Sequence, residues 1–100
     1  MDIEVASEGA KVLFAIEGKL TAQTSGELEA AIAKVDPSVR DFDFDLSNVS
    51  YIASAGLRVL VMASKLADKR GGTMRLLHPV DEVMDILEMT GLTEVFSIER

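Results

Sequence analysis

The chain has 100 residues, of which 48% are hydrophobic, and a formal net charge of −7. This length suits a single domain over residues 1–100 with one packed core. The negative charge argues against nucleic acid or an anionic membrane surface as the main partner, because both require a basic footprint. The absence of cysteine excludes disulfides and thiolate chemistry. The acidic start and the lack of a long apolar run argue against a signal peptide and direct membrane insertion, so we expect a cytoplasmic protein.

The first third of the chain predicts two strands and a helix. Alternation over 2–5 predicts a half-buried strand, and the continuous apolar centre of 11–17 predicts a more central strand that ends at Gly18. Thr24 and Glu27 have the spacing of a capping box at the start of the following helix. The apolar stripe of that helix consists of Leu28, Ala31, Ile32 and Val35.

A strictly alternating run over 41–46 predicts the third strand. Its apolar side carries Phe42, Phe44 and Leu46, and its polar side carries Asp41, Asp43 and Asp45. Because a strand covered on both faces would not alternate so strictly, we expect helices on the phenylalanine side only. The aspartates stand roughly 7 Å apart along the strand, which makes a shared metal ion difficult, so we expect a solvated face.

The second half of the chain predicts two further helices around a fourth strand. The first helix runs over 54–70 and closes at Gly71, and the strand covers 73–77. Pro79 suits the first turn of the last helix, and 95–98 forms a short terminal strand or tail. This order predicts an α/β fold, with a mixed sheet of four to five strands and three helices mostly on one face.

Ser54 is the main candidate functional residue because its neighbours Ala53, Ala55 and Gly56 are all small. One interpretation is a helix cap, worth about 1 kcal/mol. The other is a phosphorylation site, since about two added negative charges are tolerated where free N–H groups gather at a helix N-terminus. Met62, an apolar residue among the polar residues of the same helix, is either a partner contact or an ordinary exposed methionine.

His78 is the only histidine and therefore the only candidate base for a nucleophilic Ser54. Such a pair would require two adjacent loops and an acid that orients the ring. The glycines fit turns and caps rather than a phosphate-binding pattern. We therefore expect a binding module that is not an enzyme and that has no cofactor and no metal.

Several segments together resemble the STAS domain family, in particular bacterial anti-sigma factor antagonists. The segment 45–60, DLSNVSYIASAGLRVL, is similar to the core motif of that family. The segments 18–21, 71–72 and 89–92 match further family motifs in the same order. The resemblance covers essentially the whole chain and implies a STAS-like fold.

The resemblance implies that Ser54 is the phosphoacceptor of an anti-sigma factor with serine kinase activity. The unmodified antagonist would bind that partner and release the sigma factor, and the phosphorylated form would dissociate. Regulated members usually carry aspartates where this chain has Ala53 and Thr21. The alternative is an unmodified STAS subunit of a lipid-transport or sensory complex. The implied contact residues are Gly18, Lys19, Leu20, Thr21, Ala53, Ser54, Ala55, Gly56, Arg58 and Met62.

Overall fold

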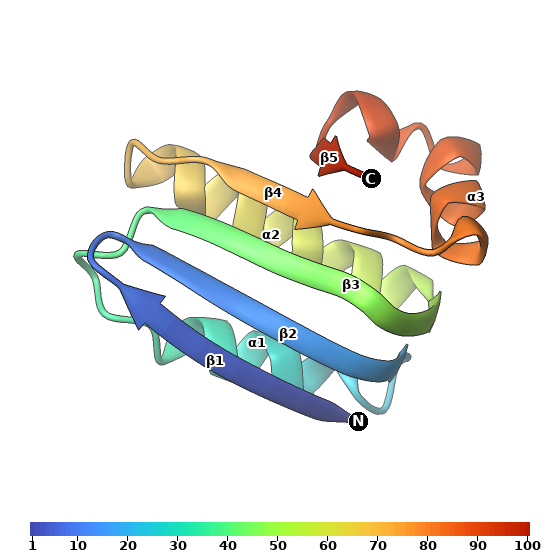
Figure 1. Cartoon of the computed structure of the whole chain (residues 1–100), viewed down its shortest axis with the longest axis horizontal. Coiled ribbons are helices and arrows are strands. Elements are labelled where there is room, and N and C mark those ends of the chain that lie inside the picture. Colours follow the sequence, from blue (N-terminus) through green and yellow to red (C-terminus); the bar gives the residue numbers. More distant parts are fainter.

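The computed structural model describes residues 1–100 and contains one five-stranded sheet with the strands in sequence order (Figure 1). β1 is antiparallel to β2, whereas the pairs β2–β3, β3–β4 and β4–β5 are parallel. This arrangement confirms the predicted mixed α/β fold. The strands are β1 (Asp2–Glu8), β2 (Lys11–Leu20), β3 (Asp41–Ile52), β4 (Met74–Leu77) and β5 (Ser97–Glu99). The helices are α1 (Ser25–Ala33), α2 (Ser54–Lys69), α3 (Asp81–Met89) and the short 3₁₀ helix η1 (Leu92–Glu94).

The helices α1 and α2 lie side by side behind the sheet, while its other face carries no helix (Figure 1). The side chains of Phe42, Phe44 and Leu46 are fully buried under these helices. Phe14 of β2 stacks on Phe44 with ring centroids 5.0 Å apart. The alternation in β3 therefore identified the covered face correctly.

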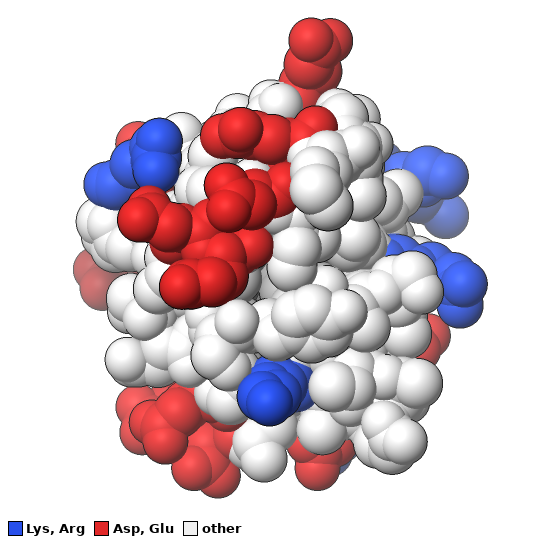
Figure 2. Space-filling view, turned by 90° about the vertical axis from the view of Figure 1, so that its right-hand side faces the viewer, with Lys and Arg blue, Asp and Glu red and all other residues white.

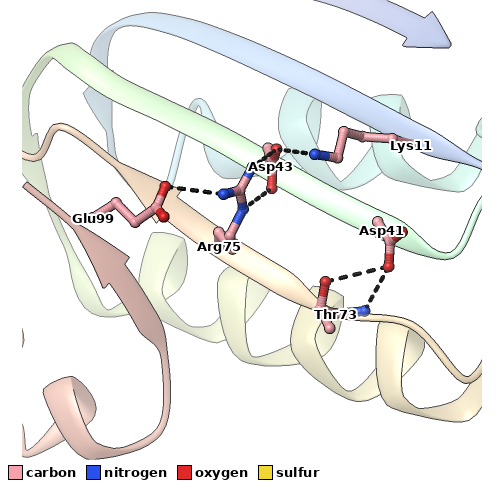
Figure 3. A network of polar contacts seen from close by, with 6 residues as sticks. All are labelled: Lys11, Asp41, Asp43, Thr73, Arg75 and Glu99. Carbon is pink, nitrogen blue, oxygen red and sulfur yellow. Dashed lines mark hydrogen bonds and ion pairs between the residues drawn. The ribbon is translucent and has the colours of Figure 1, made fainter.

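The open face of the sheet differs from the expected row of solvated aspartates. Asp43 is only 4% exposed, because Arg75 of β4 donates two hydrogen bonds to its carboxylate, at 2.9 and 2.7 Å (Figure 3). Lys11 lies 3.5 Å from the same carboxylate, and Arg75 also pairs with Glu99 of β5. A charged network thus crosses β2, β3, β4 and β5, and it buries Asp43 on a face without helices.

Three local predictions were wrong. Gly18 does not end β2, because a register shift at a positive φ of 116° lets the strand continue to Leu20. Thr24 is the N-cap of α1 as predicted, but the capping box does not form, because its side chain makes no cap bond and its hydroxyl donates instead to the carbonyl of Lys19. Pro79 precedes α3, whose N-cap is Val80. No helix in the structure is long and apolar enough to span a membrane.

Candidate partner-binding surface

The ends of β2 and β3 bring together the two segments that the sequence analysis assigned to partner binding. Lys19 pairs with Tyr51 and Leu20 with Ile52 in the parallel ladder. One residue further, the N–H of Ala53 donates to the carbonyl of Leu20 at 2.7 Å. The segments 18–21 and 53–56 therefore form one continuous surface, although more than thirty residues separate them in the chain.

Gly56 allows the first turn of α2 to sit directly on this junction. A Cβ at this position would lie 2.8 Å from the Cβ of Leu20 and 2.9 Å from the Cγ2 of Ile52. Real Cβ atoms do not approach other atoms so closely, so any larger residue would push α2 away from β2. The glycine of the motif thus has a packing role that fixes where α2 begins.

Ser54 is exposed and is the first residue of α2. The N-cap is Ala53, whose backbone is extended, and no side chain caps the helix. The prediction that Ser54 is the helix cap is therefore wrong by one position. The first intrahelical bond joins the N–H of Leu57 to the carbonyl of Ala53, so earlier N–H groups of the turn have no helical acceptor. The Ser54 hydroxyl is exposed to solvent at the positive end of the helix dipole.

The loop between β2 and α1 is held by its own threonines. The Thr24 hydroxyl donates to the carbonyl of Lys19 at 2.6 Å and accepts a hydrogen bond from the N–H of Thr21 at 2.8 Å. The Ser25 hydroxyl donates to the carbonyl of Thr21. These bonds fix the loop before any partner arrives, so binding does not have to order it.

Two exposed apolar side chains lie close in sequence to Ser54. Tyr51, at the end of β3, is 47% exposed, and Met62, two turns along α2 from Ser54, is 41% exposed. Met62 is one of the predicted contact residues, and Tyr51 is not. The aromatic residue lies directly before the buried Ile52 and is typical of a strand interior. Tyr51 lies an even number of residues from Asp41, Asp43 and Asp45, so the alternation of β3 places it on the open face of the sheet.

The charges around this end of the molecule are divided between two helices. The space-filling view shows an acidic group of side chains over α3 and basic side chains along the opposite border, with a mostly uncharged area between them that has a basic side chain in its lower part (Figure 2). The exposed acidic residues of α3 are Asp81, Glu82, Asp85 and Glu88. Of the exposed basic residues of α2, Arg58 lies about one turn from Ser54, whereas Lys65 and Lys69 lie in the C-terminal half of the helix. This arrangement favours a partner that carries basic groups opposite α3 and acidic groups opposite α2.

The structure does not bring His78 to Ser54. The ladder between β3 and β4 ends at the pair Asp45–Leu77, and β3 continues for seven more residues to Ile52. That extension corresponds to roughly 20 Å of strand. His78 instead donates its backbone N–H to the carbonyl of Glu99. The serine and histidine therefore do not form the pair that nucleophilic catalysis would need. The structure also contains no group of three or more acidic, histidine or cysteine side chains with metal-binding geometry.

Comparison with known proteins identifies the family. A family model described as "Mlab, STAS domain" matches residues 3–98. The chain belongs to the STAS domain family. This STAS domain is 24% identical over 98 residues to the anti-sigma-B factor antagonist of Bacillus subtilis. The alignment covers 98% of this chain and 90% of the relative.

Solved structures confirm the fold of this STAS domain. An anti-sigma factor antagonist from Mycobacterium paratuberculosis aligns with a TM-score of 0.85 at 24% identity, over 98% of this chain and 84% of that chain. The Bacillus cell fate determinant SpoIIAA in its phosphorylated form aligns with a TM-score of 0.77 at 15% identity, over 99% of this chain and 92% of that chain. The resemblance seen in the motif around Ser54 thus extends through the whole fold.

Proposed function

We propose that this STAS domain is an anti-sigma factor antagonist, which binds an anti-sigma factor with serine kinase activity and is regulated by phosphorylation of Ser54. The observation that carries the proposal is that the segments 18–21 and 53–56 adjoin around an exposed serine at the start of α2. The curated relatives named anti-sigma factor antagonists support the same role.

The physical mechanism is a change of charge on a preformed surface. The residues next to Ser54 in the chain are small and uncharged, so a partner can pack closely against Ala53 and Ala55. A phosphoryl group adds about two negative charges and bulk at the centre of that contact. The free N–H groups at the start of α2 accommodate those charges within the fold, while a partner built for the neutral surface loses affinity. The modification therefore changes association and leaves the domain folded.

The test of this switch is labelling with ATP and the anti-sigma factor kinase of the source organism. Phosphate is expected on the wild type, with the added mass mapped to Ser54 by fragmentation. The variant Ser54→Ala should remain unlabelled, whereas Ser50→Ala, which removes an exposed serine four residues earlier, should be labelled like the wild type. Labelling that persists in Ser54→Ala would contradict the assignment of the switch.

The alternative is an unmodified STAS subunit of a lipid-transport or sensory complex. The sequence feature that favours it is the pair Ala53 and Thr21, which replaces the aspartates that regulated members usually carry. Affinity purification from the source organism separates the two functions. Recovery of a histidine-kinase-like ATPase supports the antagonist, and recovery of transporter subunits supports the alternative.

A further inference from the structure

The outer edge of β1 is a free edge of the sheet. β1 is seven residues long, pairs only with β2, and ends the strand order, as its position at the border of the sheet in Figure 1 shows. A free edge presents a row of unpaired N–H and C=O groups that can pair with another strand. The opposite edge, formed by β5, has only three residues. β1 is therefore the edge with the greater capacity to accept a partner.

A groove with an apolar centre runs between this edge and α1. Its lining includes Val5 and Ser7 of β1 and Ala30 and Ala31 of α1. Val5 points toward the helix layer, since it pairs with the buried Phe14, yet it is 50% exposed. The small side chains of the two alanines leave space beside it. An apolar side chain of this size, half-exposed beside a free strand edge, indicates a surface suited to a second strand and helix.

Glu27 and Lys34 line the same groove and flank its two alanines. Glu27 lies in the first turn of α1 and Lys34 is its C-cap, so they are seven residues apart, which is two helical turns and about 10 Å. Their charges are opposite, and the midpoint between them falls at Ala30 and Ala31. A two-fold axis through that midpoint would place Glu27 of one copy beside Lys34 of the other, and the reverse pair would form at the same time.

We propose that the occupant of this groove is a second copy of the chain, with β1 pairing antiparallel to its counterpart around Val5. The two sheets would then form one continuous sheet, and the two α1 helices would flank each other on the covered face. The contact would be isologous, so it closes as a dimer and exposes no new edge of β1. The surface lies on β1 and α1, away from Ser54, so this inference is independent of the proposed function.

The length of the paired segment selects the register. With Val5 opposite itself, Glu4 faces Ala6 of the other copy, and Asp2 faces Glu8 only at the ends of the paired segment. A shift that centres the pair on Glu4 would oppose that carboxylate to itself. A shift that centres it on Ala6 would oppose Glu4 to Glu8. Each of these registers opposes some like charges, which destabilises a sheet. The register around Val5 is favoured because it alone pairs all seven residues of β1 and keeps the like charges at the outermost positions.

Sedimentation velocity from micromolar to millimolar concentration tests the proposal on the intact chain. We expect a monomer–dimer equilibrium, which Val5→Asp weakens by about tenfold or more through the loss of apolar contact and the added repulsion. Val95→Asp is the matched control, because Val95 is 56% exposed and lies outside the groove. Asp2→Asn is expected to strengthen the dimer. A wild type that is monomeric over the whole range would overturn the proposal.

A charge exchange tests the predicted contact between the α1 helices. Glu27→Lys and Lys34→Glu should each weaken the dimer, since each brings like charges together. The double variant should restore the wild-type association, because opposite charges again face each other across the axis. A dimer that both single variants leave unchanged would contradict this arrangement.

A single introduced cysteine tests the register directly. The chain contains no cysteine, so Val5→Cys adds one thiol per copy. Residues directly opposite each other across antiparallel strands have Cβ atoms about 4.5–5.5 Å apart, which brings the two thiols together. Mild oxidation should therefore yield a disulfide-linked dimer with Val5→Cys and much less with Val95→Cys. Equal cross-linking of the two variants would overturn the register.

Discussion

Gly56 at the start of α2 packs against Leu20 at the end of β2, and no room is left between them for a side chain. A Cβ on Gly56 would lie 2.8 Å from the Cβ of Leu20 and 3.2 Å from its carbonyl oxygen. This contact joins the loop that follows β2 to the segment that carries Ser54. The position of Ser54 relative to the loop after β2 therefore depends on Gly56 having no side chain.

The substitution Gly56→Ala tests that dependence. We expect it to lower the free energy of unfolding by about 1–3 kcal/mol, because the added methyl group overlaps Leu20 and Ile52. Urea unfolding followed by circular dichroism measures the change. Gly26→Ala is the matched control, since a Cβ there meets nothing within 4 Å, and alanine is favoured in a helix by up to about 1 kcal/mol. Equal effects of the two substitutions would contradict the packing role of Gly56.

Ser54→Ala should leave the stability of the domain almost unchanged. The Ser54 side chain is exposed and makes no cap bond, and the N-cap is Ala53. We expect a change within about 0.5 kcal/mol, whereas the loss of a capping serine costs about 1 kcal/mol. The same urea experiment distinguishes these values. A loss of 1 kcal/mol or more would mean that the hydroxyl stabilises the helix, and it would weaken the case for a free acceptor.

The buried carboxylate of Asp43 should make stability depend on pH. Burial favours the protonated form, but the hydrogen bonds and charge of Arg75, together with Lys11, outweigh it and hold the pKa of Asp43 below its ordinary value. A lowered pKa in the folded state means that the stabilisation is complete above the unfolded value of about 3.9. It is lost as the pH falls through the lower folded value.

Asp43→Asn should remove this part of the pH dependence. It should also cost about 1–3 kcal/mol at neutral pH, because Arg75 loses its charged partner. Thermal or urea unfolding between pH 2 and 7 measures both effects. The exposed Asp68→Asn variant is the control and should follow the wild-type curve. If Asp43→Asn and the wild type lose stability in parallel on acidification, the role assigned to the network is wrong.

The division of charge between α2 and α3 predicts how the partner is oriented. Arg58→Glu on α2 and Glu82→Lys on α3 should each weaken binding of the anti-sigma factor, by about 5–30-fold, because each places a like charge against the complementary partner. Arg40→Glu and Glu29→Lys make the same changes on exposed residues outside this surface and should bind normally. Association rates measured at two salt concentrations should show the effect decreasing at high salt. Weakening by only one of the two variants would show that the partner contacts one helix alone.

The sequence predicted the elements that follow a clear period, and it failed where distant residues decide the outcome. Phe42 and Phe44 alternate with aspartates, so the covered face of β3 was evident from the chain alone. The burial of Asp43 was not, because Arg75 lies 32 residues away and approaches only when β4 pairs with β3. Pattern alone cannot reveal such a partner.

In the candidate site, too, some features could be predicted from the sequence and others depend on the folded structure. The small residues around Ser54 indicated an accessible serine, and the exposed Ser54 agrees with that prediction. Its position one residue inside α2 rather than at the cap depends on the backbone of Ala53, which no side-chain preference fixes. Tyr51 was missed because the predicted strand ended at Leu46, whereas β3 continues to Ile52 with Tyr51 on its open face.

The most direct test of the central claim is the affinity of this domain for the anti-sigma factor of its source organism, measured by isothermal titration calorimetry. The wild type should bind, and Ser54→Asp, which places a negative charge where the phosphoryl group would be, should lose about tenfold or more in affinity. Ser97→Asp makes the same change at an exposed serine of β5 and should bind like the wild type. Equal affinities for the wild type and Ser54→Asp would contradict the claim that the surface around Ser54 is the binding site.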